Sequence, residues 1–261
     1  MSQVWKTVAA WQERRRALTG GSIGLVPTMG ALHNGHASLV ERCRRENETV
    51  VVSIFVNPTQ FNDPKDLDRY PRTLDRDVAM LESLGADEII VPSAADLYPN
   101  GYRFRVEPDS SYLVLEGACR PGFFQGVATV VLKLLNIVRA DRAYFGEKDY
   151  QQLQLIKDMT RDFFIPTEIV PCQTVREESG LAQSSRNMLL SPESRQRAAH
   201  LFRALSTACD PARARSILEA EGFAVEYVEE RWGRRLAAVF LDGVRLIDNV
   251  PIPETERASH S

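Results

Sequence analysis

The sequence predicts an α/β fold, with a parallel sheet and its helices followed by a small α+β domain. Two observations indicate this fold. From residue 22 to residue 170, short apolar runs alternate with amphipathic segments, the order typical of parallel strands joined by right-handed crossovers. After Thr174 the alternation ends, and two helical segments precede three strand-like segments. We therefore expect one domain at residues 1–173 and a second at residues 174–261.

The elements of the first domain follow from the periodicity of its apolar residues. Apolar runs predict strands at residues 22–27, 49–56, 88–91, 142–145 and 165–170. The run TVVVSIFV at residues 49–56 is nearly all apolar, as in a strand buried on both faces of a sheet. Helical spacing predicts helices at residues 5–18, 36–45, 73–84, 126–138 and 150–163. Gly20 and Gly85 follow two of these segments as helix ends.

The second domain is read in the same way. Helical spacing covers residues 192–209 and 211–221, and strand-like patterns cover residues 224–228, 236–241 and 244–247. Residues 254–261 form a polar tail.

Composition limits the classes of function. A chain of 261 residues with 44% hydrophobic residues can bury a sizeable core. The formal net charge of −3 does not favour nucleic acid, whose partners usually show a basic balance. The amino terminus lacks a signal-peptide core, and no apolar run is long enough to span a membrane. We expect a cytoplasmic protein with no membrane partner, and a solvated face for the run ERRR at residues 13–16.

The four cysteines indicate a reducing compartment. Cys43, Cys119, Cys172 and Cys209 are far apart, with no metal-binding spacing among them and the histidines. We expect four free thiols, with Cys119 and Cys172 as small buried hydrophobes rather than reactive groups.

Two of the four histidines, His33 and His36, lie in the segment PTMGALHNGH at residues 27–36. This segment joins the first of these strands to a helix, where ligands of open α/β sheets bind. Unpaired N–H groups and the helix dipole attract phosphate there. Gly30 and Gly35 are expected to take positive φ or to let the backbone approach a ligand. A cap or a solvated side chain is the alternative for each histidine, but the pair and its setting favour a nucleotide site with imidazole donors.

The next predicted strand ends in FVNPTQF, residues 55–61, on the same edge of the sheet. The amides of Asn57 and Gln60 suit the hydroxyls and carboxylate of a small polar substrate. The alternative is a simple turn, because Asn-Pro commonly starts one.

A third loop, FGEKDYQQ at residues 145–152, follows the strand predicted at residues 142–145. Lys148 is either a phosphate contact or a solvated side chain at a capped helix start. Asp149 either caps that helix or holds a ribose hydroxyl, and Gln152 lies one turn further on.

Three further segments have open interpretations. In GLAQSSRN, residues 180–187, two serine hydroxyls and the forked donors of Arg186 suit a triphosphate, or the segment is a helix-capping turn. LEGACRPGFFQGV, residues 115–127, is a lid, a substrate wall or an ordinary loop. The acidic stretch of Asp63, Asp66, Asp68, Asp75 and Asp77 is expected to be solvated surface, from which one carboxylate reaches the water shell of a magnesium ion at most.

Taken together, these segments resemble the pantothenate synthetase (pantoate–β-alanine ligase) family. The likeness runs in family order through PTMGALHNGH, SIFVNPTQF, YPRTLDRD, LEGACRPG, FGEKDYQQ, SSRN and VRLIDN, and covers about residues 4–250. It implies a Rossmann-like nucleotidyltransferase domain with a smaller carboxyl-terminal lid domain, in a homodimer. The implied reaction condenses pantoate with β-alanine through a pantoyl adenylate, using ATP and Mg²⁺ and releasing AMP and pyrophosphate.

The resemblance also implies roles for matched residues. Catalysis is assigned to His36, as proton donor, together with His33 and Lys148. Pantoate contacts fall on Gln60 and Gln152, and Gln60 also meets β-alanine. No direct metal ligand is implied. The implied ATP contacts are Pro27, Met29, Gly30, Ala31, Leu32, His33, Asn34, Gly35, His36, Gly146, Glu147, Lys148, Asp149, Val175, Gln183, Ser184, Ser185 and Arg186.

The chain departs from the family pattern at three positions and in one length. Phe123 and Gln125 stand where the family often has His and Arg, and Gln183 stands where a hydrophobic residue is usual. The carboxyl-terminal domain also lacks an insertion that is usual between its strands.

Two other functions compete with this interpretation. A nucleotidyltransferase that transfers AMP to a phosphorylated acceptor shares the histidine loop, but would need extra basic residues where FVNPTQF offers amides. A non-catalytic nucleotide-binding module is favoured only by Phe123 and Gln125, and the retained histidines, Lys148 and Arg186 argue against it.

Overall fold

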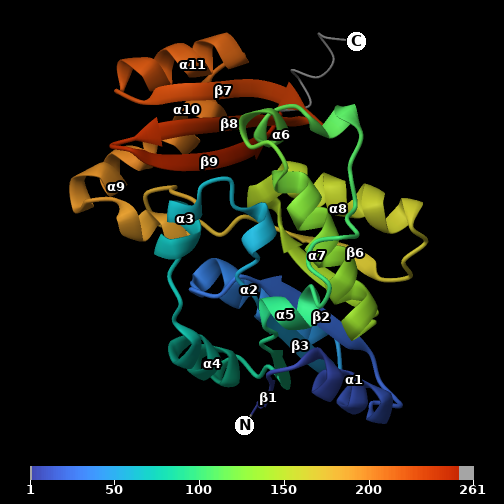
Figure 1. The fold of residues 1–261 in the computed structure, drawn as a ribbon. Helices are drawn as coiled ribbons and strands as arrows, with labels where there is room; N and C mark the ends of the chain where they lie inside the picture. Colours follow the sequence, from blue (N-terminus) through green and yellow to red (C-terminus); the bar gives the residue numbers. More distant parts are fainter. Residues whose placement is uncertain (1, 253–261) are drawn as a thin grey trace. The chain divides into compact units, whose positions relative to one another are not determined.

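The computed structural model describes residues 2–252, so the polar tail predicted at residues 254–261 lies outside the described residues. The chain forms two compact units. Unit 1 comprises Met1–Glu147 and Gln151–Cys172, and unit 2 comprises Lys148–Tyr150 and Gln173–Ser261. The short segment Lys148–Tyr150 therefore belongs to the second unit, although it lies in the middle of the first in sequence. Each unit is described by itself below (Figure 1).

Unit 1 is built on a six-stranded sheet in the order β1-β4-β3-β2-β5-β6. All neighbouring strands are parallel. The strands are β1 (Gln3–Trp5), β2 (Ile23–Thr28), β3 (Thr49–Ile54), β4 (Glu88–Ile90), β5 (Arg142–Gly146) and β6 (Glu168–Cys172). The predicted parallel sheet is confirmed, because each apolar run forms a strand.

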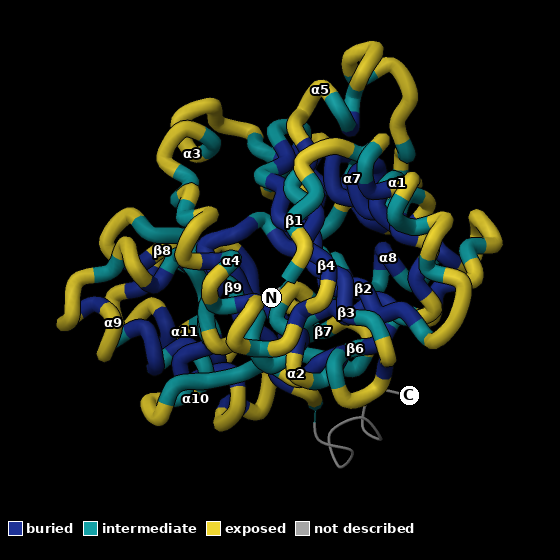
Figure 2. The backbone as a smooth tube through the Cα atoms, turned by 90° about the horizontal axis from the view of Figure 1, so that it is seen from below, coloured by how far each residue is buried: buried dark blue, intermediate teal, exposed yellow. Residues whose placement is uncertain are grey.

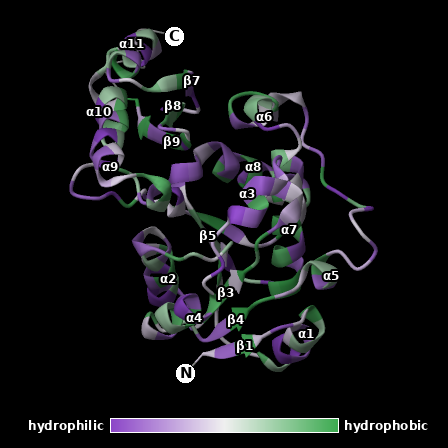
Figure 3. Ribbon diagram, turned by 60° about the vertical axis from the view of Figure 1, so that its left-hand side comes forward, coloured by the Kyte–Doolittle hydropathy of each residue, from purple (hydrophilic) through white to green (hydrophobic). Residues whose placement is uncertain are grey.

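Helices cover both faces of this sheet. The α-helices are α1 (Val8–Ala17), α2 (Asn34–Glu46), α3 (Pro64–Arg69), α4 (Leu74–Ser83), α5 (Ala94–Leu97), α6 (Glu116–Cys119), α7 (Phe123–Val138) and α8 (Tyr150–Asp162). Short 3₁₀ helices are η1 (Pro58–Gln60), η2 (Ser110–Tyr112) and η3 (Glu147–Asp149). Figure 3 shows α2 and α4 on one side of the sheet and α1 and α7 on the other.

The core explains why these segments fold as they do. The strands β2, β3 and β4 run through the most buried part of unit 1, and α7 is buried along much of its length (Figure 2). On one face, Val40 and Cys43 of α2 and Leu81 of α4 pack against the sheet. The helix α2 approaches β2 closely, since a Cβ at Gly24 would lie 2.3 Å from the Cys43 sulfur.

Two predictions at the amino terminus are wrong. The helix expected at residues 5–18 begins only at Val8, because Gln3–Trp5 forms the edge strand β1 beside β4. The run at residues 13–16 is not wholly solvated. Arg14 is half-buried and its Nε lies 2.7 Å from the buried Glu88 carboxylate, while Arg15 donates to the Val138 carbonyl at 2.8 Å. These two side chains fix α1 to its neighbours.

Unit 2 is an antiparallel sheet with helices packed on it. The sheet has the order β7-β8-β9, with β7 (Ala224–Arg231), β8 (Arg234–Leu241) and β9 (Val244–Pro251). Its helices are α9 (Pro192–Ala198), α10 (His200–Thr207) and α11 (Pro211–Ala220), preceded by the 3₁₀ helix η4 (Ser185–Leu189). Leu201 and Leu205 of α10 and Leu218 of α11 form a core with the inner face of the sheet. The predicted α+β character is confirmed.

Two tight hairpins join the strands of unit 2. The two-residue turns are Trp232-Gly233, with φ of 53° and 70°, and Asp242-Gly243, with φ of 50° and 80°. Positive φ at both residues matches the primed turn whose twist suits an antiparallel pair.

Within the described range, no helix has both the length and the apolar character needed to cross a membrane. All four cysteines are free, as expected. Cys43 and Cys172 are buried, but Cys119 is exposed, so its predicted burial is wrong. Burial raises the pKa of the Cys43 thiol to about 12, and burial also raises the pKa of Cys172 although Arg42 opposes the shift. Both buried thiols therefore stay protonated and unreactive.

We predict that Trp232→Asn stabilises the protein. Trp232 has a φ of 53° in its hairpin turn, a conformation that costs most side chains free energy and that Asn adopts more readily. The free energy of unfolding should rise by about 0.5–1 kcal/mol in urea titration. Trp232→Ala removes the same indole without supplying this preference and should not stabilise. An equal gain in both variants would contradict the explanation.

Candidate active site

The loops of interest in unit 1 leave one edge of its sheet. Strand β2 lies between β3 and β5, and the order of the strands runs away from β2 in both directions. The point where the order reverses is where open parallel sheets bind ligands. The loops after β2, β3 and β5 leave at the carboxyl ends of these strands, as the sequence predicts.

The loop after β2 places the two histidines at the start of α2. His33 is the N-cap of α2, and its Nδ1 accepts from the Gly35 N–H at 3.1 Å. In a neutral ring this bond assigns the proton to Nε2, so Nε2 is the donor of the His33 ring. The rings of His33 and His36 lie with centroids 4.2 Å apart at 42°. The cap and the paired imidazoles therefore coexist at the positive end of a 13-residue helix.

The backbone of this loop is held by a buried carboxylate from α4. Asp77, 1% exposed, accepts from the Ala31 and Leu32 N–H groups at 2.9 Å each. Gly30 has a φ of 80°, as expected, and a Cβ there would lie 3.0 Å from an Asp77 oxygen. Gly35, by contrast, lies in the first turn of α2. The prediction that Asp77 is solvated is therefore wrong, since its charge organises the histidine loop.

The loop after β3 carries two buried amides, Asn57 and Gln60. Asn57, 1% exposed, donates to Gln60 Oε1 at 3.0 Å and to the Gly126 carbonyl at 3.2 Å, and its oxygen accepts from the Tyr98 hydroxyl at 2.9 Å. Its polar atoms are thus used within the protein, so Asn57 orients Gln60 rather than meeting a substrate directly.

Gln60 connects this loop to the histidine loop. Its Nε2 donates to the sulfur of Met29 at 3.2 Å, and Asn57 fixes its oxygen. A thioether is a weak acceptor, so a carboxylate or hydroxyl oxygen would be a better partner for the same N–H group. The geometry places a substrate-type amide beside the residues predicted to bind a nucleotide.

The start of α7 supports η1 by very close packing. A Cβ at Gly126 would lie 2.5 Å from the Thr59 carbonyl oxygen. Only a glycine lets the helix approach this backbone, and Thr59 directly precedes Gln60.

The segment at residues 112–117 is fixed rather than loose. Gln151, 2% exposed, accepts from the Glu116 N–H at 3.0 Å and donates to the Val114 carbonyl at 2.9 Å. Its neighbour Gln152 is half-buried. The sequence analysis selected Gln152 as a substrate contact and missed the structural role of Gln151. The location of Gln151 in the first turn of α8 was the signal that could have indicated it.

Phe123, one of the residues that depart from the pattern described above, packs within the protein. Its ring is buried and lies under the Arg120 guanidinium, with 3.6 Å between the guanidinium carbon and the ring centroid. Gln125 contributes its main-chain carbonyl to the Tyr102 hydroxyl at 3.1 Å. The replacement at residue 123 therefore maintains apolar packing at the start of α7.

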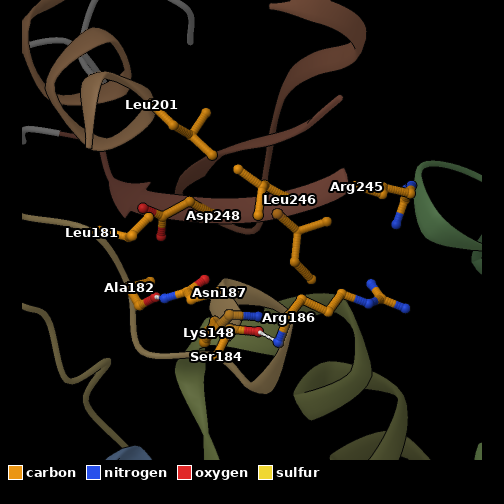
Figure 4. A pocket seen from close by; sticks show the side chains of 11 residues that line it. Lys148, Leu181, Ala182, Ser184, Arg186, Asn187, Leu201, Arg245, Leu246 and Asp248 are labelled. Atoms are coloured by element: carbon orange, nitrogen blue, oxygen red, sulfur yellow. Dashed lines mark hydrogen bonds between the residues drawn. The ribbon is translucent and has the colours of Figure 1, made fainter. Parts of the chain in front are cut away.

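Unit 2 contains a pocket lined by other predicted phosphate contacts. Lys148, Ser184 and Arg186 line it across from Leu246 and Asp248 of β9 (Figure 4). Ser184 also caps η4, because its hydroxyl accepts from the Arg186 N–H at 3.3 Å. The capping interpretation and the ligand interpretation of SSRN are thus compatible.

The remaining predicted contacts of unit 2 lie near this segment. Val175 and Gln183 pair across a hairpin, with the Gln183 N–H bonding the Val175 carbonyl at 2.9 Å. Asp149 is exposed, and its carboxylate lies 3.9 Å from Lys148 Nζ. Gly146 and Glu147 lie at the end of β5 in unit 1.

The comparisons with known proteins identify the family of this chain. A family model described as Pantoate-beta-alanine ligase matches residues 3–251, a span that contains every loop discussed above. The chain belongs to the pantoate–β-alanine ligase family. Family members named pantothenate synthetase include the protein of Bdellovibrio bacteriovorus, 52% identical over 252 residues that cover 97% of this chain and 100% of the relative. The protein of Cereibacter sphaeroides is 47% identical over 279 residues, covering 97% and 100%.

Solved structures of the family have the same fold. Pantothenate synthetase from Thermus thermophilus has a TM-score of 0.90 and 44% identity, covering 97% of this chain and 100% of that one. The pantoate–β-alanine ligase from Francisella tularensis, solved in complex with beta-gamma ATP and β-alanine, has a TM-score of 0.91 and 42% identity, covering 96% and 98%. The alignment with the Bdellovibrio family member spans all of that relative, so the two chains are nearly equal in length.

We predict that Asp77→Asn destabilises the protein by about 1–3 kcal/mol, because an amide must turn its own NH₂ toward one of two backbone donors. Urea unfolding measures the change. Asp75→Asn, on the exposed side of the same helix turn, should change stability by less than about 0.5 kcal/mol. Equal effects of the two variants would show that Asp77 does not hold the loop.

We also predict that Gly126→Ala lowers stability by about 1–3 kcal/mol in spite of the better helix propensity of Ala. The added methyl meets the Thr59 carbonyl and must displace η1. Gly20→Ala, where no atom lies within 4 Å of the new Cβ, is the control. A neutral Gly126→Ala in thermal and urea unfolding would disprove the close-packing argument.

Proposed function

We propose that this chain condenses pantoate with β-alanine, using ATP, to form pantothenate through a pantoyl-adenylate intermediate with release of AMP and pyrophosphate. Membership of the family supports the overall reaction. The Francisella relative, crystallised with beta-gamma ATP and β-alanine, supports ATP and β-alanine as substrates.

One observation in unit 1 carries the proposal. The paired rings of His33 and His36 stand at the amino end of α2, and Gln60 reaches Met29 in the same loop. This geometry supports a phosphate site beside a site for a polar substrate at the edge of the sheet, as joining a carboxylate to a nucleotide requires.

The first step forms the adenylate. A pantoate carboxylate oxygen attacks the α-phosphorus of ATP, and the bond from that phosphorus to the bridging oxygen breaks, so pyrophosphate takes the electron pair. Negative charge grows on the phosphate oxygens. We assign its stabilisation to N–H donors of His36 and His33 and to the Lys148 ammonium. The amide of Gln60, together with Gln152, holds pantoate.

The second step forms the amide bond. The amine of β-alanine, beside Gln60, attacks the carbonyl carbon of the adenylate. The bond between that carbon and the AMP oxygen breaks, AMP leaves, and the amine loses a proton. No protein nucleophile is required, so positioning and exclusion of water provide much of the rate.

The family resemblance supplies the proposed ATP contacts of each unit. Unit 1 contributes Pro27, Met29 to His36, Gly146 and Glu147. Unit 2 contributes Lys148, Asp149, Val175 and Gln183 to Arg186, and its role as a lid domain stays a prediction, as do the homodimer and the cytoplasmic location.

Mg²⁺ enters the proposal as a companion of ATP. Among residues 2–252, no group of three or more His, Cys, Asp or Glu side chains is arranged to hold a metal ion. The side chains of these residues therefore do not fit a dedicated protein metal centre. Mg²⁺ bound to nucleotide phosphates, by contrast, needs few protein ligands. When bound there, the ion neutralises phosphate charge.

We predict that purified wild-type protein with ATP, pantoate, β-alanine and Mg²⁺ yields AMP, pyrophosphate and pantothenate in equal amounts. Chromatography of the products decides the reaction. A dinucleotide product from a phosphorylated acceptor would show that the protein is a nucleotidyltransferase instead, and absence of AMP would refute the proposal.

We further predict that His36→Ala lowers kcat by about 10²–10⁴-fold, the contribution typical of a positioned proton donor. His200→Ala is the matched control, because His200 lies in unit 2 and contacts Glu221 at 2.8 Å. It should leave turnover unchanged. Circular dichroism and thermal melting check that both variants fold, and unchanged turnover in His36→Ala would remove His36 from the mechanism.

A further inference from the structure

A largely buried ion pair in unit 2 includes Asp248, which lines the pocket. Arg176 and Asp248 pair through two bonds, Nη1 to Oδ2 at 2.6 Å and Nη2 to Oδ1 at 3.0 Å. Asp248 has a side chain only 3% exposed, and the Arg176 guanidinium stacks on Phe202 at 3.8 Å. Such a bidentate pair fixes orientation as well as distance.

Arg176 also ties a hairpin to β9. Its Nη1 donates to the Gly180 carbonyl at 3.1 Å, and its Nη2 donates to the Asn249 carbonyl at 3.3 Å. The hairpin ends in Gln183 and continues directly into Ser184–Arg186. The next residue, Asn187, is buried and donates back to the Ala182 carbonyl at 3.0 Å. The segment that carries Arg186 is therefore anchored to β9 through Arg176.

The next residue on β9, Asn249, holds the backbone of Lys148, the other cation proposed to contact phosphate. Asn249 donates from Nδ2 to the Lys148 carbonyl at 2.9 Å, while its Oδ1 accepts from Arg234 at 2.8 Å. The Asn249 N–H also donates to Asp248 at 2.8 Å. Two adjacent residues of one strand thus fix the backbones of two segments that are far apart in sequence.

We propose that Arg176, Asp248 and Asn249, together called the β9 clasp, are positioning residues that hold Lys148 and Ser184–Arg186 in one arrangement for the phosphates of ATP. This inference rests on the proposed function, because it takes ATP as the ligand of those residues.

The physical reason is preorganisation. Lys148 and Arg186 both line the pocket, and two cations in one pocket repel each other, although the exposed Asp149 carboxylate, 3.9 Å from Lys148 Nζ, offsets part of that repulsion. A rigid connection through β9 offsets that repulsion before ATP binds and lowers the ordering cost of binding. Asp248 also lines the pocket, and its two bonds to Arg176 hold its carboxylate in one orientation.

A purely structural role is the competing explanation, and unit 2 offers a matched control. Arg235, 2% exposed, pairs with Glu230 at 2.7 Å between β7 and β8. Glu230 is outside the residues that line the pocket. Glu230→Gln therefore removes the same kind of charge from a buried arginine in the same unit.

The test compares Asp248→Asn and Asn249→Ala with Glu230→Gln in the full-length protein. Calorimetry with ATP gives the dissociation constant, and steady-state assays give the KM for ATP and, at saturating ATP, the KM for pantoate. We expect ATP binding about tenfold weaker in both clasp variants, since one charge-assisted bond or one backbone anchor is lost. The KM for pantoate should change by less than about twofold in all three.

The outcomes separate the two explanations. Arg176→Lys retains the charge but not the fork, and partial recovery of ATP affinity relative to Asp248→Asn supports the clasp. The clasp proposal is overturned if the clasp variants lose no more ATP affinity than Glu230→Gln when their melting temperatures fall equally. An equal rise of both KM values overturns it as well. If Asp248→Asn does not fold, Asn249→Ala alone decides in the same way.

Failure of the proposed function is recognised independently. A wild-type protein that binds ATP but forms no AMP refutes the reaction, while the calorimetric comparison still tests the clasp. A wild-type protein that binds no ATP overturns both.

Discussion

Asp77 accepts hydrogen bonds from two backbone N–H groups, and the site in unit 1 depends on this constraint. The loop after β2 must turn sharply, with Gly30 and Ala31 at positive φ, to bring both histidines to the start of α2. Such a turn leaves amide donors that β2 no longer pairs. A carboxylate buried beneath the loop accepts two of them at 2.9 Å and thereby holds a strained segment in one conformation. The bonds from Asp77 therefore fix the backbone that leads to His33 and His36.

The same principle recurs at the other loops. Asn57 uses its amide inside the protein so that Gln60 faces one way, and Gln151 bonds two main-chain groups of the segment at residues 112–117. In each place one buried polar side chain bonds the loop, and a candidate ligand contact, Gln60 or Gln152, lies beside it. Burial alone does not distinguish the two kinds of residue, because Gln60 is buried as well.

Most of the fold could be predicted from the sequence, because long apolar runs and helical spacing report burial directly. The edge strand β1 was missed because three half-exposed residues carry no such pattern. Asp77 was misjudged because a carboxylate in an acidic run looks solvated until α4 turns it inward. The ordered motifs identified the family, but the bond from Arg176 to Asp248 spans 72 residues and that from Asn249 to Lys148 spans 101. No local pattern encodes pairings of that length.

The path of the chain has a further consequence. Lys148–Tyr150 joins unit 2 from within the sequence of unit 1, and the chain then returns to unit 1 for α8 and β6 before leaving again. Unit 2 is thus discontinuous, and a fragment that starts at residue 173 would carry Arg186 without Lys148. The hydrogen bond from Asn249 to the Lys148 carbonyl closes a loop of about a hundred residues. The entropy lost on closing this loop must be offset by contacts around the two bonded residues. During synthesis the pocket lined by Lys148 and Arg186 is completed only when β9 emerges, so unit 2 gains this pocket late.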